Sequence, residues 1–254
     1  MISMYNYLFQ IISEHDIEVV KQELHQKGLK SIYFIEEDAT GTIFIGGQTR
    51  KKISTKKAFL IEEKAAVNWE DQWSMFAHDF KEGKAHIKIS DKTLLLLPGP
   101  GFGDLSHPTT QLMIEMMQER ICNESVIDIG SGSGILTLAA LLLDAKSAIG
   151  IEIDAAAIKH AKKNAKLNGL KAKFVKTIPK NIPPSVCLMN MILPEQKDLD
   201  PTHFNPFAKL WIVSGVLSEQ KNEYLMLAKK WGWTLVKEFS RDDWMGWIFS
   251  LETL

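Results

Sequence analysis

The sequence predicts an α/β protein built on a doubly wound, mostly parallel sheet, preceded by a small α+β unit. From Thr109 onward, patterns typical of strands and helices alternate along the chain. Before Glu63 the elements are shorter and follow a different order. The 254 residues, of which 45% are hydrophobic, suffice for one large domain and one small one.

The small unit is expected over residues 1–63. Ile17, Val20 and Leu24 recur at helical spacing, and Gly28 can end that helix. Strands are expected at 31–35, 42–45 and 58–61. A full strand–helix–strand needs roughly 5 residues per strand and roughly 11 per helix, besides loops. Residues 40–62 are too few for this, so the unit should lack a second helix.

Residues 64–93 are expected to connect the two units. Trp69, Trp73, Phe76 and Phe80 follow one another at steps of four and three, which places them on one face of a helix over 68–80. Such an aromatic face indicates packing against a neighbouring domain.

The large domain is expected over residues 94–254. A strand should begin at Leu94 and end in the Pro/Gly turn 98–103, because proline lacks a donor and glycine tolerates positive φ. Helices are expected at 109–121, 134–143, 155–168 and 217–230. Strands are expected at 125–129, 147–152, 173–175, 186–189, 210–214, 234–239 and 247–251. The last two strands have no helix between them, which predicts a hairpin with an antiparallel strand.

Composition indicates a cytoplasmic protein without a metal site. The net charge of −1 does not favour nucleic-acid or membrane binding. Cys122 and Cys187 lack metal-ligand spacing and are expected to be buried thiols. We find no signal peptide, and the most apolar run, 135–143, is shorter than the ~20 residues that span a bilayer.

One segment departs from the near-zero net charge of the chain. Residues 159–180 contain eight lysines and no acidic residue. Lys159, Lys162, Lys163 and Lys166 share one helical face, opposite Ile158, Ala161 and Ala165. We interpret this face as solvated. A docking surface for RNA or an acidic partner is the alternative.

A glycine turn lies between the strand ending at Ile129 and the helix that follows. Glycines stand at 130, 132 and 134, whereas a dinucleotide-binding turn would need glycine where Ile135 stands. Asp128 precedes the turn, and Glu152 ends the next strand, 22 positions after Gly130. An acid there can accept hydrogen bonds from ribose hydroxyls. This D-x-G-x-G-x-G pattern resembles motif I of class I S-adenosylmethionine-dependent methyltransferases.

A longer stretch narrows the resemblance to one family of these methyltransferases. Residues 98–110, PGPGFGDLSHPTT, resemble the P-G-x-A-F-G-T-G-x-H-P-T-T stretch of the ribosomal protein L-eleven methyltransferase family, PrmA. Further similar segments are 69–76, 150–154, 164–169, 190–193 and 214–217. The resemblance implies a Rossmann-like, seven-stranded methyltransferase sheet. It also implies methyl transfer to lysine or α-amino nitrogens of a ribosomal protein, gripped by the small N-terminal domain.

The resemblance also implies the residues of the site. The implied S-adenosylmethionine contacts are Phe102, Thr110, Asp128, Gly130, Ser131, Gly132, Gly134, Glu152 and Asn190. Asn190 is in addition the expected catalytic residue. Its side-chain oxygen would accept an N–H of the substrate amine and orient the nitrogen lone pair, because asparagine has no useful pKa.

Several positions depart from the family pattern and leave the substrate open. Gly103, Asp104 and Leu105 replace G-T-G, Glu152 replaces aspartate, and Pro194 replaces alanine. Two alternatives therefore remain: a methyltransferase acting on RNA or a small molecule, and a degenerate scaffold that binds S-adenosylmethionine. The methylated residue, the number of methyl groups and the oligomeric state do not follow from the sequence.

Overall fold

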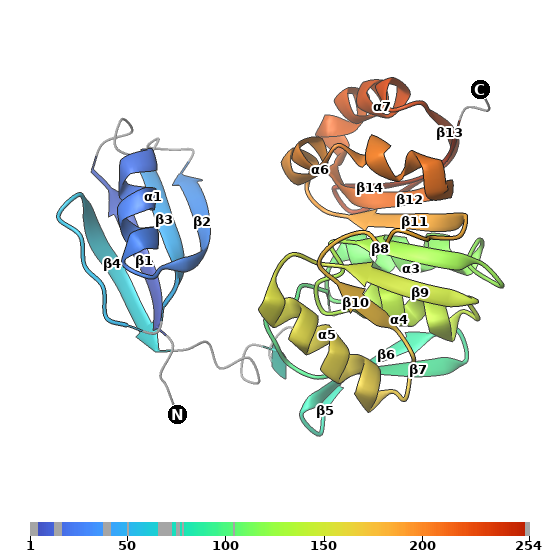
Figure 1. The fold of residues 1–254 in the computed structure, drawn as a ribbon, viewed down its shortest axis with the longest axis horizontal. Coiled ribbons are helices and arrows are strands. Elements are labelled where there is room, and N and C mark those ends of the chain that lie inside the picture. The colour runs from blue at the N-terminus through green and yellow to red at the C-terminus, as the bar shows by residue number, and fades with distance from the viewer. Residues whose placement is uncertain are drawn as a thin grey trace. The chain divides into compact units, whose positions relative to one another are not determined.

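The computed structural model describes residues 5–12, 17–37, 42–49, 51–65, 73–74, 77, 79–103 and 105–251. The chain divides into two compact units, residues 1–68 and residues 69–254 (Figure 1). Within the described ranges, no helix is long and apolar enough to cross a membrane.

The N-terminal unit is a four-stranded antiparallel sheet with one helix. Its elements are β1 (Tyr5–Ile11), α1 (Ile17–Gln26), β2 (Lys30–Glu37), β3 (Thr42–Thr49) and β4 (Ala58–Ala65). The strand order is β2-β3-β1-β4, so the unpredicted strand β1 lies inside the sheet. Tyr7, Phe9 and Ile11 alternate along β1 and are buried with Val20 and Leu24 of α1. As expected, residues 51–57 contain no second helix.

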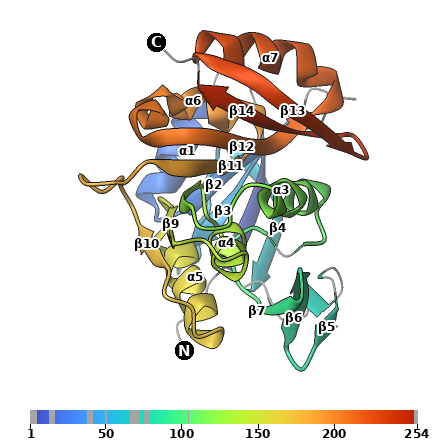
Figure 2. The same ribbon diagram turned by 90° about the vertical axis from the view of Figure 1, so that its right-hand side faces the viewer.

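A three-stranded antiparallel sheet opens the second unit, at the end away from α7 (Figure 2). It contains β5 (Phe80–Lys81), β6 (Lys84–Ile89) and β7 (Lys92–Leu96), of which only the last was expected. The helix predicted over 68–80 is wrong at its end, because Asp79 has φ +46° and Phe80 begins β5. Trp73 and Ser74 are helical, whereas Trp69 and Phe76 lie outside the described residues.

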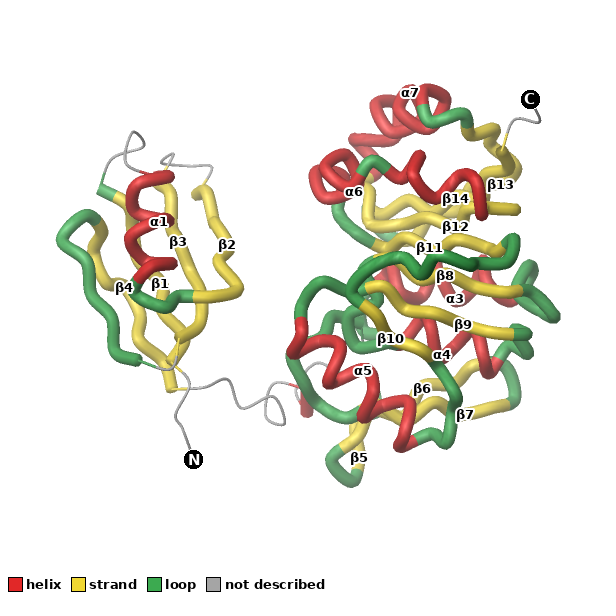
Figure 3. The backbone as a smooth tube through the Cα atoms, viewed as in Figure 1, coloured by secondary structure: helices red, strands yellow, loops and turns green. Residues whose placement is uncertain are grey.

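The main sheet has seven strands in the order β10-β9-β8-β11-β12-β14-β13, and the expected doubly wound, mostly parallel fold is confirmed. Only β14 runs antiparallel to its neighbours, as predicted for the final hairpin. The strands are β8 (Ser125–Ile129), β9 (Ser147–Ile151), β10 (Lys173–Val175), β11 (Ser185–Asn190), β12 (Ala208–Leu217), β13 (Trp233–Arg241) and β14 (Trp244–Leu251). Figure 3 shows how helices and strands alternate along this unit.

Helices cover both faces of this sheet. They are α3 (Pro108–Gln118), α4 (Ile135–Leu142), α5 (Ala155–Leu167), α6 (Leu193–Leu199) and α7 (Lys221–Lys230), with 3-10 turns η2 (Pro201–Phe207) and η3 (Ser218–Gln220). One core cluster joins α3, α4 and α5 to one sheet face, and a second joins α6, η2 and α7 to the other. Helix α6 and η2 were not expected from the sequence.

Strand β8 pairs with β9 on one side and β11 on the other. The chain moves outward through β9 to β10, then returns across β8 to start β11. In an open α/β sheet, this reversal leaves a crevice beyond the carboxyl ends of the two central strands. The glycine turn after Ile129 and the segment after Asn190 therefore lie at the same crevice.

The two cysteines have different environments. Cys187 is buried, and burial raises the pKa of its thiol to about 12. Cys122 is exposed, so the expectation that both thiols are buried is wrong for this residue. It lies just after Ile121 and before β8, where the chain turns at Asn123 with φ +60°.

Candidate functional site

A pocket of about 760 Å³ lies at the crevice. Five residues expected from the sequence line it: Phe102, Gly130, Gly132, Glu152 and Asn190. Four others expected there do not line it: Thr110, Asp128, Ser131 and Gly134. Most pocket residues come from the loop after β7, the turn after β8, the end of β9, the start of α5 and the segment after β11, and others come from the start of α3, β12 and β14.

The glycine turn packs directly against the loop that follows β7. A Cβ atom on Gly101 would lie 2.4 Å from the Ser133 nitrogen, and one on Gly132 would lie 2.7 Å from the Phe102 carbonyl oxygen. Gly132 also has φ +50°, which disfavours a side chain. The two backbones can touch only because both positions are glycine. A side chain at Gly132 would therefore displace the loop, rather than fill the ligand space.

Hydrogen bonds hold the two backbones together. The Ser133 N–H donates to the Phe102 carbonyl (2.9 Å), and the Ser133 hydroxyl donates to the Gly103 carbonyl (2.7 Å). Phe102 is fixed through its backbone, while its side chain is 58% exposed and lines the pocket. The loop thus supplies an apolar wall whose position depends on the glycine turn.

Helix α5 and its C-terminal cap hold β7 and the loop after it with three polar side chains at steps of four: His160, Asn164 and Asn168. Asn164 accepts from the Leu97 N–H (2.9 Å) and donates to the Ser133 carbonyl (2.9 Å). Asn168 accepts from the Leu95 N–H (2.8 Å) and donates to the Leu95 carbonyl (2.7 Å). The helix therefore holds β7, the loop after it and the glycine turn as one piece.

His160 completes this set. The Gly101 N–H donates to its Nδ1 (3.3 Å), so its Nε2–H can donate to the Leu97 carbonyl (2.6 Å). Burial lowers the pKa of His160, which keeps the ring neutral at pH 7 and preserves both roles.

Glu152 ends β9 with its carboxylate between two backbone donors. It accepts from the Gly132 N–H (3.0 Å) and the Asp154 N–H (2.9 Å), one on each oxygen. These bonds orient the half-buried carboxylate at the pocket wall. A carboxylate has about four lone-pair sites, so both oxygens can still accept from a ligand diol.

Asp128 lies beneath the turn and is 1% exposed. One carboxylate oxygen accepts from both the N–H (2.9 Å) and the hydroxyl (2.6 Å) of Thr137, which ties the first turn of α4 to β8. Burial raises the pKa of Asp128 to about 6, and the Thr137 bonds offset part of this rise. The hydrogen bonds between Asp128 and Thr137 therefore support the glycine turn.

Thr110 and Ser131 are also buried beside this site. Thr110 lies in the first turn of α3 and is 0% exposed, and Ser131 in the glycine turn is 4% exposed. Within the described residues, neither hydroxyl oxygen has a hydrogen-bond partner. A buried hydroxyl without a partner is costly, so these two atoms can accommodate a bound water or a ligand group.

Asn190 is the last residue of β11, and its half-buried side chain faces the pocket. In the part of the chain that the structure describes, this amide makes no hydrogen bond with the protein. It is therefore free to bind a ligand.

Sequence reasoning missed Gln196, which positions the segment after Asn190. The fully buried Gln196 amide donates to the Met191 carbonyl (2.6 Å) and the Ser214 carbonyl (3.0 Å), and accepts from the Tyr224 hydroxyl (2.7 Å). A buried glutamine in the unpredicted helix α6 gives no local sequence signal.

An aromatic wall was also missed. The His107 ring centroid lies 5.5 Å from that of Phe102 and 5.0 Å from that of Trp244, and all three residues line the pocket. Trp244 belongs to β14, far along the chain. Only the sheet order brings this strand beside the start of α3.

The pocket fits an adenosyl cofactor. Its volume lies within the range of roughly 300–1,000 Å³ that is typical of small-molecule sites. Apolar side chains for an adenine ring come from Ile129, Ile151, Ile153, Ala157 and Met191. Glu152 supplies the acceptor for a ribose diol. In the described part of the chain, no cluster of three or more His, Cys, Asp or Glu residues could hold a metal ion.

The chain is similar to known proteins over most of its length. A family model described as ribosomal protein L11 methyltransferase (PrmA) matches residues 9–251. A ribosomal protein L11 methyltransferase of Chromobacterium violaceum is 39% identical over 54% of this chain and 48% of its own length. One of Histophilus somni is 33% identical over 78% of this chain and 72% of its own length.

A solved structure has the same fold. The ribosomal protein L11 methylase of Lactobacillus delbrueckii subsp. bulgaricus matches with a TM-score of 0.59 and 23% identity, over 69% of this chain and 92% of that one. The chain spans less than half the length of the Chromobacterium relative and nearly three quarters of the Histophilus one.

Proposed function

The chain belongs to the ribosomal protein L11 methyltransferase family, and we propose that it transfers methyl groups from S-adenosylmethionine to amine nitrogens of ribosomal protein L11. The observation that carries this proposal is the pocket itself. The unpartnered Asn190 amide lies in the same pocket as the backbone-oriented Glu152 carboxylate. The Asn190 amide suits a reacting amine, and the Glu152 carboxylate suits a ribose diol.

S-adenosylmethionine supplies a methyl carbon on a positively charged sulfur. In this proposal, Glu152 accepts hydrogen bonds from the ribose hydroxyls with the lone pairs that the Gly132 and Asp154 N–H groups leave free. Ile151 and Ile153, which line the pocket, would contact the adenine, and the glycine turn leaves room for close backbone approach.

Asn190 would position the substrate. Its side-chain oxygen would accept an N–H of the neutral amine and so orient the nitrogen lone pair toward the methyl carbon. The N–C bond would form as the C–S bond breaks, and the methylated nitrogen would release a proton to water. An amide does not take up a proton at pH 7, so its contribution is orientation. Gln196 keeps the backbone beside it in place through the Met191 carbonyl.

The charge of the pocket favours a cationic substrate over a nucleic acid. Four carboxylates line it: Glu152, Asp154, Glu195 and Asp198. They attract the protonated form of a lysine or α-amino group, which must release its proton to water before it reacts, and they repel RNA phosphates. This disfavours the alternative of a nucleobase substrate in this pocket.

The N-terminal unit would recognise the protein substrate. Its edge strand β4 exposes Phe59 and Ile61, at 61% and 51%, which offers apolar contacts and an unpaired strand edge. The missing second helix reduces the docking surface, so we expect altered recognition of L11 and fewer methylated sites. A ribosomal substrate implies a reaction in the cytoplasm.

Labelled S-adenosylmethionine tests the proposal. The full chain is incubated separately with purified L11 and with ribosomal RNA, and the products are identified by mass spectrometry. We expect label on lysine or α-amino nitrogens of L11, and labelling roughly a hundredfold slower when Asn190→Ala replaces the native chain. Label on RNA alone, or on neither acceptor, would contradict the proposed function.

A deletion of residues 1–68 tests the role assigned to the N-terminal unit. The truncated chain should bind S-adenosylhomocysteine nearly as well as the full chain, because every pocket residue lies in the second unit. Transfer to L11 should be lost. Equal transfer by both chains would show that residues 1–68 do not recognise the substrate.

A further inference from the structure

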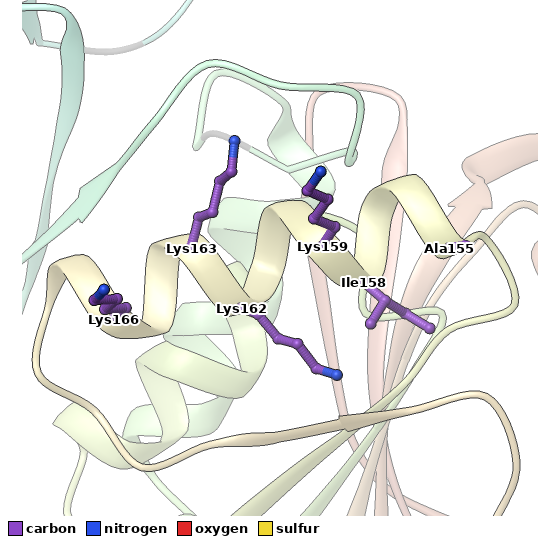
Figure 4. A pocket seen from close by; sticks show the side chains of 6 residues that line it. All are labelled: Ala155, Ile158, Lys159, Lys162, Lys163 and Lys166. Carbon is purple, nitrogen blue, oxygen red and sulfur yellow. The ribbon is translucent and has the colours of Figure 1, made fainter.

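The outward face of α5 carries four lysines, Lys159, Lys162, Lys163 and Lys166, which we call the lysine face. All four are exposed, and steps of three and four place them along one side of the helix. In Figure 4, Lys159 and Lys163 extend from one flank of this side and Lys162 from the other. A shallow depression lies between them, lined also by Ala155 and Ile158.

The positive charge continues onto the edge of the sheet. Beyond α5 come four more exposed lysines: Lys171, Lys173, Lys176 and Lys180. Lys173 lies in β10, which is the outermost strand of the sheet. Residues 155–180 contain these eight lysines and no acidic residue. The rest of the chain therefore contains 22 of the 30 basic residues and all 31 acidic residues.

Within the ranges that the structure describes, ion pairs do not neutralise this charge. Among the described residues, none of the eight lysines forms a salt bridge. Elsewhere in the same unit lysines pair with acids, as Lys209 does with Glu124 and Lys237 with Glu119. The lysine face is thus a strip of uncompensated positive charge on a chain whose other residues carry a net negative charge.

We propose that the lysine face binds the phosphate backbone of ribosomal RNA. That the RNA is ribosomal rests on the proposed function, whose substrate is a ribosomal protein. Lysine is depleted from protein–protein interfaces, whereas it is a main source of phosphate contacts. An acidic protein is therefore the less suitable partner for a face of this composition.

The lysine face lies close to the pocket, so RNA bound there would be near the site of methyl transfer. Asp154 and Ala157, at the start of α5, line the pocket, and Lys159 follows within one turn. RNA on the lysine face would lie beside the pocket entrance, while the pocket carboxylates keep phosphates out. The enzyme could hold a ribosomal particle by its RNA and present a protein amine to Asn190.

Fluorescence anisotropy with a labelled RNA hairpin tests this proposal on the full chain. Each phosphate contact contributes about 0.9 to the slope of log affinity against log salt on a duplex, and about 0.7 on a single strand. Replacing Lys162 and Lys163 by glutamine should lower the slope by up to about 1.8 and weaken binding about 10- to 60-fold at 0.1 M salt.

The variant Lys229→Gln/Lys230→Gln is the matched control, because it removes the same charge from an adjacent, exposed pair on α7. It should bind RNA like the native protein, and thermal melting verifies that both variants are folded. Equal losses in both variants, salt-independent binding, or tighter binding of polyglutamate than of RNA would overturn the proposal. Methylation of free L11 is measured separately, so failure of the proposed function is recognised independently.

Discussion

Replacing Asn164 by alanine should both destabilise the second unit and impair cofactor binding. Asn164 is 0% exposed, and its removal leaves the Leu97 N–H and the Ser133 carbonyl without their partner. The buried Ser133 carbonyl costs about 1–3 kcal/mol when unsatisfied, and the half-buried Leu97 N–H costs at most as much, so the free energy of unfolding should fall by about 1–6 kcal/mol. For a unit of this size, about 2–4 °C of melting temperature is lost per kcal/mol.

Asn168→Ala is the matched control, since Asn168 holds Leu95 of the same strand but does not contact the glycine turn. It is only half-buried, so water can replace part of its bonding and the loss of stability should be smaller. We expect Asn164→Ala to weaken S-adenosylhomocysteine binding about tenfold, and Asn168→Ala to leave it nearly unchanged.

Thermal unfolding and isothermal titration calorimetry measure the two effects. If Asn164→Ala melts within a degree of the native protein, the bonds to Leu97 and Ser133 do not support the fold as argued. If the two variants lose affinity equally, the contact with the glycine turn does not position the cofactor.

Three further predictions concern the pocket and its support. Glu152→Gln should weaken S-adenosylhomocysteine binding about 10- to 150-fold in calorimetry, since a charged acceptor is worth about 1.5–3 kcal/mol; unchanged affinity would remove Glu152 from the ribose site. Asn190→Ala should slow single-turnover transfer roughly a hundredfold, whereas Lys229→Ala should not, and equal rates would make Asn190 merely structural. Burial raises the pKa of Asp128 to about 6 from 3.8, so the native state binds more protons and its free energy of unfolding should fall by up to about 3 kcal/mol as pH rises between these values. Asp128→Asn should abolish this part of the pH dependence in urea titrations, and identical profiles would show that Asp128 does not titrate there.

The main sheet was predictable because its strands carry their own signals. Residues 125–129 and 173–175 form strands with the bounds that the sequence indicates, since buried parallel strands are short apolar runs between turns. The end of the helix predicted over 68–80 is wrong because apolar steps of three and four do not reveal the left-handed Asp79 that precedes β5. Strand β1 was missed although Tyr7, Phe9 and Ile11 alternate.

The candidate site was predictable only where it is local. Gly130, Gly132 and Glu152 lie on or next to one strand–turn–helix–strand unit, and the structure places all three in the pocket. The orientation of Asp128 could have followed from alternation, because Ile127 and Ile129 face the opposite core cluster. Trp244 could not have been found this way, because its place depends on the strand order of the whole sheet.

The contact between Gly101 and Gly132 also limits how this site can evolve. Because the two segments meet backbone to backbone, no enlargement at one glycine can be matched by a reduction at the other. Selection must therefore keep both glycines, or change the glycine turn and the loop after β7 together. Changes of substrate are left to the side chains around it, such as Phe102, Trp244 and those of α6. Because the backbone contact stays fixed while the side chains around it can change, the same cofactor can be used with different substrates over evolutionary time.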